Sequence, residues 1–396
     1  MLDKIIKEKV EQSIGILKDK NIDMWLIFAR ESSTVHDPMM DMVVGKNCTW
    51  HSAFIFCKDG DTAAIVGSIE ESNFTELECF KEVIGYVQSV KEPLLEYLKK
   101  KNPEQIAINF SVNSSLADGL SHGMYITLRE YLMEIGMENR LISAEEIVSS
   151  VKGRKSPSEL AIMKEAITET LRIFDEVTKF IKPGKTEKEI SDFTKQFVFD
   201  KGFGLAWDED HCPAVFTGPD TAGAHSGPTD KRVEKGHIVN MDFGILYKGY
   251  CSDLQRMWYV LKDDETDAPE EVKKGFNIIK DAIRMSAAKL KPGMTGCEID
   301  DIARNYITEN GYEEYPHGLG HQVGRQVHDG GAGLFPRWER YGNAPFMKLE
   351  KNQIFTIEPR LPVAGYGTST LEEMVYLTED GCEFISTPQE ELMLIR

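Results

Sequence analysis

Residues 182–192 read KPGKTEKEISD and residues 291–301 read KPGMTGCEIDD, so the same pattern recurs 109 positions later. In both copies a threonine is followed three residues on by a glutamate, which is the capping-box pattern of a helix N-terminus. A long stretch of helical periodicity precedes each copy, over residues 156–181 and 269–290. The repeat indicates a duplicated half-domain, and two such copies usually pack about a pseudo-twofold axis. We therefore expect a functional site that both copies share at that axis.

The repeat lies in the second of two predicted domains. Residues 1–150 alternate helical patterns with strand patterns, among them residues 24–29 and a hairpin at 53–67, which predicts a compact α/β domain. Residues 156–159 read Ser-Pro-Ser-Glu, a capping box with proline at the first helical position. A second domain, residues 151–396, is therefore expected to begin with a long helix. The predicted fold class is α/β (α+β), with a duplicated C-terminal domain.

Composition excludes several classes of protein. The 396 residues are 41% hydrophobic and 28% charged, as in globular proteins, and the formal charge of −19 disfavours binding to a nucleic-acid backbone. The apolar stretches fall far short of the roughly 20 residues that span a membrane, and the N-terminus lacks a secretory-signal pattern. The seven cysteines include no CxxC pair, which fits reduced thiols. We expect a cytoplasmic protein with no nucleic-acid or membrane partner.

Each copy ends in a predicted hairpin that carries two acidic residues. A turn at residues 247–248 places Asp242 opposite Asp253, and the pattern of the second hairpin places Glu358 opposite Glu372. Like charges that face each other are destabilising unless a cation neutralises them. Four such carboxylates suit two divalent metal ions about 3.5–4 Å apart. The alternative is that both pairs lie on solvated hairpin faces.

Three histidines, His317, His321 and His328, lie between the hairpins in a glycine-rich segment, residues 316–329. Glycines at such density indicate that backbone segments approach closely, as they do around a ligand or metal. One imidazole added to the carboxylates makes a mixed nitrogen and oxygen set that suits Mn, Co, Fe or Zn. For each histidine, a packed core or surface side chain is the alternative.

These motifs resemble those of the pita-bread metallopeptidases, and among them the branch of Xaa-Pro aminopeptidases and Xaa-Pro dipeptidases (prolidases). The resemblance covers nearly the whole chain and implies a creatinase-like N-terminal α/β domain followed by a duplicated pita-bread catalytic domain with pseudo-twofold symmetry. It rests on Asn240-Met241-Asp242-Phe243-Gly244, Cys251-Ser252-Asp253, His317-Gly318-Leu319-Gly320-His321 with His328, Thr356-Ile357-Glu358-Pro359, and Leu371-Glu372-Glu373.

The resemblance implies a set of metal ligands and a reaction. Asp253 and Glu372 are expected to bridge two divalent metal ions, Asp242 to bind one of them, and His321 with Glu358 to complete the other. Mn is the metal expected first, with Co, Zn or Fe as alternatives. The implied reaction is hydrolysis of the peptide bond before proline in short proline-containing peptides, by a hydroxide that bridges the two metals.

The resemblance also implies residues that handle protons and substrate. Glu358 is expected to accept a proton as well as to bind metal. His225 and His328 are expected to stabilise the tetrahedral intermediate and to help protonate the departing amine, whereas His317 is expected to support the site from outside the ligand set. For His225, a loop imidazole with no catalytic role is the alternative. A homodimer is the assembly that the resemblance implies.

The chain departs from the branch at two positions. Members commonly have arginine two residues before the bridging glutamate, where this chain has Thr370, and glycine two residues after the first glutamate, where this chain has Arg360. The hairpin pattern predicts that these two residues face each other. We hypothesise that Arg360 brings its guanidinium to the same region from the opposite strand. An exposed arginine on the hairpin is the alternative.

Other functions on this fold are weighed against the same residues. Creatinase-like hydrolases work without metal and have lost ligand residues, and a catalytically silent binding module predicts the same loss. This chain retains all five expected ligands, which favours a metallopeptidase. Methionine aminopeptidases share the ligands but usually lack a substantial N-terminal domain. Dipeptidase and aminopeptidase action both stay open.

Overall fold

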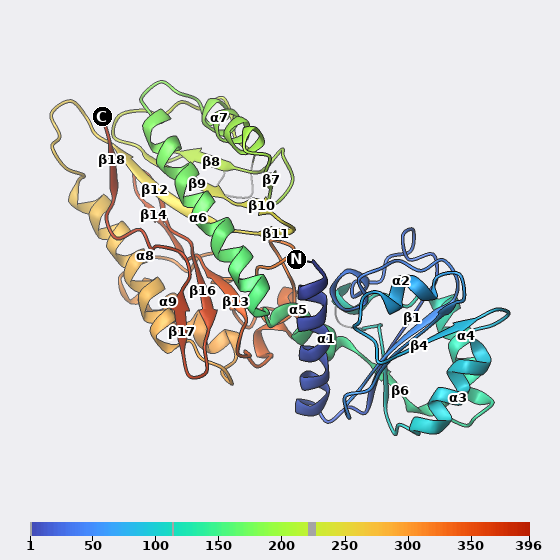
Figure 1. Ribbon diagram of the computed structural model, residues 1–396. Helices are drawn as coiled ribbons and strands as arrows, with labels where there is room; N and C mark the ends of the chain where they lie inside the picture. The colour runs from blue at the N-terminus through green and yellow to red at the C-terminus, as the bar shows by residue number, and fades with distance from the viewer. Residues whose placement is uncertain (1, 113–114, 221–226) are drawn as a thin grey trace. The chain divides into compact units, whose positions relative to one another are not determined.

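A computed structural model describes residues 2–112, 115–220 and 227–396 (Figure 1). The chain divides into two compact units, Met1–Lys152 and Gly153–Arg396. No helix in the described ranges is long and apolar enough to cross a membrane.

The N-terminal unit is built on a mixed sheet whose strand order is β4-β3-β2-β1-β5-β6. Its strands in the described residues are β1 Met24–Ala29, β2 Ser52–Cys57, β3 Thr62–Gly67, β4 Glu82–Tyr86, β5 Ile106–Ile108 and β6 Leu141–Ser143. Its helices are α1 Leu2–Asp19, α2 Glu71–Thr75, α3 Lys91–Lys101, α4 His122–Met133 and α5 Glu145–Gly153. The predicted strand at 24–29 and the predicted hairpin at 53–67 are both confirmed.

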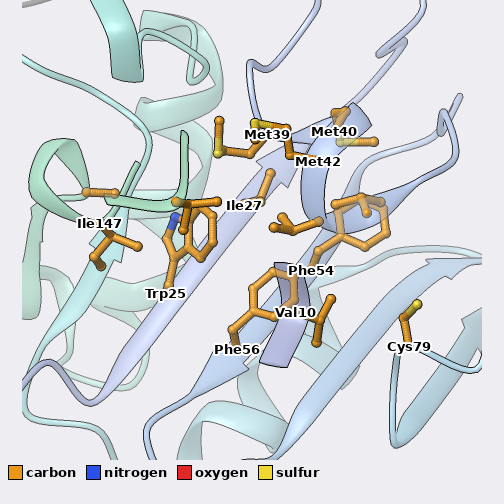
Figure 2. Packing of buried hydrophobic residues seen from close by; sticks show 14 of the residues in the cluster. Val10, Trp25, Ile27, Met39, Met40, Met42, Phe54, Phe56, Cys79 and Ile147 are labelled. Atoms are coloured by element: carbon orange, nitrogen blue, oxygen red, sulfur yellow. The ribbon is translucent and has the colours of Figure 1, made fainter. Parts of the chain in front are cut away.

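Alternate residues of β1 pack against helices on opposite faces of this sheet. Trp25 and Ile27 belong to a buried cluster that includes residues of α1 and α5, such as Val10 and Ile147 (Figure 2). The residues between them point to the other face, where the cluster includes side chains of α3 and α4. Burial on both faces explains why the strand is apolar along its whole length rather than alternating.

The C-terminal unit contains the two copies of the repeat in succession. The first copy comprises α6 Pro157–Phe180, α7 Glu187–Asp200, β7 Gly204–Leu205, β8 Ala214–Thr217, β9 Ile238–Phe243, β10 Ile245–Tyr247, β11 Tyr250–Cys251 and β12 Leu254–Val260. The second comprises α8 Glu270–Lys289, α9 Gly296–Glu309, β13 Ile354–Ile357, β14 Arg360–Val363, β15 Gly367–Thr370 and β16 Glu373–Leu377. Two further strands follow, β17 Cys382–Phe384 and β18 Met393–Ile395.

The predicted capping boxes form the starts of three of these helices. Ser156, Thr186 and Thr295 cap α6, α7 and α9, and in each case the carboxylate of the glutamate three residues later accepts a hydrogen bond from the backbone N–H of the cap residue. Each box satisfies N–H groups that a helix N-terminus leaves without partners. The helices α7 and α9 therefore begin at equivalent positions in the repeat.

The two copies meet edge to edge. Gln255 of β12 and Glu372, just before β16, exchange backbone hydrogen bonds, at 3.4 Å from the Gln255 N–H and 3.2 Å from the Glu372 N–H. The Asn240 side chain donates to the Thr368 carbonyl oxygen at 2.9 Å. Strand β12 of the first copy accordingly lies beside β16 of the second (Figure 1). The hairpin that carries each acidic pair thus borders the other copy.

The predicted register of the first hairpin is wrong by two residues. Asp242 pairs with Gln255, not with Asp253, because the turn lies at Lys248-Gly249 and not one residue earlier. Both turn residues have positive φ, 50° and 83°, which matches the two-residue hairpin turn in which glycine is favoured. Asp253 lies just before β12.

The second hairpin has the predicted register. Ile357 pairs with Glu373 in one ladder and Arg360 pairs with Thr370 in the next. Glu358 and Glu372 lie between these two ladders, opposite each other on the two facing segments.

Candidate active site

A cavity of about 490 Å³ opens in the C-terminal unit where the two copies meet. Residues from both hairpins and from the connection between α9 and β13 line it. All but one of the predicted site residues are among them, namely Asp242, Asp253, His317, His321, His328, Glu358 and Glu372. The exception is His225, which lies outside the described residues.

His321 lies at the centre of the acidic side chains. Its Nε2 is 3.4 Å from Glu358 Oε1 and 3.5 Å from Asp253 Oδ2. Asp253, His321 and Glu372 each offer one ligand atom, and these three atoms all lie within 4.8 Å of one another. This spacing suits side chains that surround a cation.

Asp253 and Glu372 are buried, Asp242 and Glu358 are half-buried, and no nearby cation contributes to the pKa shifts of these four carboxylates. Burial raises the pKa of Asp242 to about 7. Burial, followed by the charges of neighbouring carboxylates, raises the pKa values of Asp253, Glu358 and Glu372 well above the usual range. Asp242 Oδ1 and Glu372 Oε1 are buried without a hydrogen-bond partner among the described residues. Buried anionic oxygens without partners are costly, so these residues fit a site that binds divalent metal ions.

Glu372 and its neighbour Glu373 have different surroundings. Glu372 lines the cavity, whereas Glu373 is paired with Arg256 at 3.0 Å and accepts a hydrogen bond from the Ser386 hydroxyl at 2.6 Å. Successive residues of a strand point to opposite faces, which explains the division. Glu373 is thus a buried structural carboxylate, and Glu372 is the one available to a ligand.

A buried ion pair on α9 positions the histidine-rich segment. Arg304 binds Asp300 through two hydrogen bonds of 2.7 and 3.0 Å and donates at 2.8 Å to the carbonyl oxygens of Tyr315 and His317. The carboxylate of Asp300 also accepts from the Leu319 N–H at 3.0 Å. One guanidinium and one carboxylate therefore fix the backbone on both sides of residue 318.

The glycines of this segment permit the close approach that the sequence predicts. A Cβ at Gly320 would lie 2.0 Å from the Thr356 carbonyl oxygen, and a Cβ at Gly318 would lie 2.2 Å from the Phe335 ring. Thr356 also accepts from the His321 N–H at 3.0 Å through its hydroxyl, and that hydroxyl donates to Glu358 at 3.3 Å. The imidazole and the carboxylate are thereby tied to one strand.

Aromatic residues form part of the cavity wall, and the sequence did not single them out. Trp207, Phe216, Phe335 and Tyr341 line the cavity, together with His211. The Phe335 and Tyr341 rings stack with centroids 4.4 Å apart. These last two lie in the long connection between α9 and β13, and the length of that connection is the signal that marks it as functional.

Comparisons with known proteins give one family and a consistent fold. Residues 161–379 match the model of metallopeptidase family M24. The uncharacterized peptidase YqhT of Bacillus subtilis is 28% identical over 279 residues, which cover 70% of this chain and 73% of YqhT. The uncharacterized peptidase SAB1567 of Staphylococcus aureus is 25% identical over 336 residues, covering 84% of this chain and 87% of that protein.

Two solved structures resemble the chain over nearly its whole length. The Xaa-Pro dipeptidase of Bacillus anthracis has a TM-score of 0.69 and 24% identity, and covers 98% of this chain and 100% of its own. The X-Pro aminopeptidase of Thermotoga maritima has a TM-score of 0.66 and 25% identity, and covers 98% of this chain and 99% of its own. The expected two-domain fold is therefore confirmed.

Proposed function

This chain belongs to metallopeptidase family M24, and from that membership we propose that it hydrolyses peptide bonds that precede proline with the help of two divalent metal ions. The observation that carries the proposal is the group of carboxylates around His321, two of whose buried oxygens have no hydrogen-bond partner among the described residues. The names of the two similar structures, an Xaa-Pro dipeptidase and an X-Pro aminopeptidase, support the choice of bond.

The five proposed metal ligands are Asp242, Asp253, His321, Glu358 and Glu372. Mixed carboxylate and imidazole donors suit Mn, Co, Fe and Zn, and we propose Mn first because oxygen donors predominate. Ions held there would lower the pKa of water and polarise the scissile carbonyl group. The four carboxylates supply up to four negative charges, which two divalent cations would balance.

The remaining chemistry falls to side chains of the same cavity. We assign Glu358 to accept the proton of the attacking water, since its carboxylate borders the cavity beside His321 and is oriented by the Thr356 hydroxyl. The ring of His328 lies edge-on to that of His321, with centroids 4.3 Å apart, and His317 lines the same cavity. We assign these two imidazoles to the substrate carbonyl oxygen and to the departing nitrogen, which needs a proton to leave as an amine.

The aromatic wall supports a preference for proline. A peptide bond to proline has no N–H group, so an enzyme that grips the substrate backbone through that group binds it poorly. Recognition must then rest on the ring, and rings such as Phe335 and Tyr341 offer apolar surface for it.

Hydrolysis of matched peptides tests the proposed function. We expect metal-stripped protein to be inactive on Ala-Pro and Ala-Pro-Ala, and Mn, Co or Zn to restore cleavage before proline. Ala-Ala and Ala-Ala-Ala, which have an N–H group and no ring at that position, should be cleaved at least about tenfold more slowly, as loss of a few buried methylene groups predicts. Equal cleavage of both sets, or cleavage of neither by folded and metal-loaded protein, would contradict the proposal.

A further inference from the structure

Arg360 lies one step along the hairpin from the carboxylates of the site. It pairs with Thr370 across β14 and β15, and these residues lie two positions from Glu358 and Glu372 respectively. Alternate residues in extended chains share a face, and two residues span about 7 Å. All four side chains line the same cavity. The hairpin therefore presents a cation next to the proposed metal site, and the alternative of an exposed arginine is wrong because Arg360 is half-buried in the cavity wall.

The Arg360 guanidinium makes no hydrogen bond or ion pair with any residue that the structure describes. By contrast, Arg256 and Arg304 are buried, and each is paired with a carboxylate. A half-buried guanidinium with five N–H donors and no acceptor from the protein is suited to bind an anionic ligand.

A second unpaired donor lies beside it. The Thr370 hydroxyl donates to Gln255 Oε1 at 2.8 Å, which leaves the Gln255 amide nitrogen as the free end of that side chain. This Nε2 atom is buried without a hydrogen-bond partner among the described residues, although Gln255 is only 3% exposed and lines the cavity. A buried amide without an acceptor is costly, so a ligand oxygen at this point would relieve the cost.

We propose that Arg360, with the Gln255 amide beside it, binds the C-terminal carboxylate of the substrate and makes the chain a dipeptidase. This inference rests on the proposed function. A residue of extended chain spans about 3.5 Å. When the scissile carbonyl group of a dipeptide lies at the metal ligands, its C-terminal carboxylate therefore lies one residue further along. Arg360, one step along the hairpin from the ligands, is within reach of that carboxylate. A longer peptide places a neutral amide there. Arg360 thus determines specificity from β14, opposite Thr370 of β15.

The test compares Ala-Pro with Ala-Pro-amide and Ala-Pro-Ala on the metal-loaded enzyme. We expect kcat/KM to be about 10- to 100-fold higher for Ala-Pro than for the two substrates that have a neutral amide in place of the proline carboxylate. This ratio corresponds to the loss of one hydrogen bond to a charged group. Arg360→Met should abolish this preference, mainly by raising KM for Ala-Pro, and should leave cleavage of the amide nearly unchanged. Arg172→Met, at an arginine that is 63% exposed, is the matched control and should keep the full preference.

Two further measurements test the carboxylate contact apart from the cleavage rates of the Arg360 variant. Free proline should inhibit the wild-type enzyme about 10- to 100-fold more strongly than prolinamide, and Arg360→Met should remove that difference in Ki. Thr370→Val should reduce the preference about 2- to 10-fold, because the Gln255 amide loses the hydroxyl that orients it.

The possible failures are distinguishable. Equal cleavage of the acid and the amide, or an intact preference in folded Arg360→Met protein, overturns this inference and leaves the proposed function standing. If none of the three peptides is cleaved by metal-loaded protein, the proposed function fails and the inference fails with it.

Discussion

Glu372→Gln is expected to lower kcat/KM for Ala-Pro about 10³-fold, the upper end of the effect of removing one preorganised electrostatic group. Glu372 is 1% exposed, and its carboxylate is one of the three groups whose ligand atoms lie within 4.8 Å of one another. Glutamine keeps the shape of the side chain but not the charge. The substitution therefore removes one proposed metal ligand while the fold is kept.

Thermal unfolding separates loss of metal from loss of structure. Mn at 100 times its Kd should stabilise the wild-type protein by about 2.7 kcal/mol and the Glu372→Gln variant by much less. Without metal the variant should unfold no earlier than the wild-type protein, since one buried charge has been removed. Glu313→Gln, at an exposed glutamate, is the matched control and should retain both activity and the Mn effect. Full activity in Glu372→Gln would exclude this residue from the ligand set.

Lys155→Met is expected to lower the free energy of unfolding by about 3–5 kcal/mol, because it leaves a buried carboxylate without its cation. Lys155 Nζ is 2.9 Å from Asp329 Oδ2, and the two side chains are 1% and 2% exposed. The backbone N–H of Asp329 donates to the Gln322 carbonyl oxygen at 2.9 Å. The pair thus holds the segment that follows His328, and the variant should also lose activity at temperatures where it remains folded.

Denaturant unfolding with matched variants checks this prediction. Lys164→Met removes an exposed lysine that is 3.3 Å from Glu383, and it should change stability by less than about 1 kcal/mol. The double substitution Lys155→Met with Asp329→Asn should recover part of the loss, because the unpaired charge is gone. Equal effects of Lys155→Met and Lys164→Met would show that the buried pair contributes no more than a surface pair.

Local chemistry explains what could be predicted from the sequence. Ser156, Thr186 and Thr295 cap their helices as expected because a capping box is completed within four residues and does not depend on distant packing. The pairing of Arg360 with Thr370 was predictable for a similar reason, since the glycine turn and the apolar pattern of the second hairpin agree.

Features that depend on backbone detail or on distant contacts were missed. The first hairpin turns at Lys248-Gly249, and the positive φ of the lysine is not evident from its residue type. The aromatic wall around Phe335 and Tyr341 lies in irregular chain, where no periodicity reports which side chains face inward. The different roles of Glu372 and Glu373 follow from a distant contact, because Arg256 lies beside the carboxylate of Glu373.

Crystals grown with Mn²⁺ and measured for anomalous scattering test the central claim most directly. The account predicts two anomalous peaks in the cavity about 3.5–4 Å apart, with carboxylate oxygens of Asp253 and Glu372 between them. Asp242 should contact one ion, and His321 with Glu358 the other. A single peak, or a cavity without any peak in crystals that bind Mn²⁺ elsewhere, would contradict a dinuclear site.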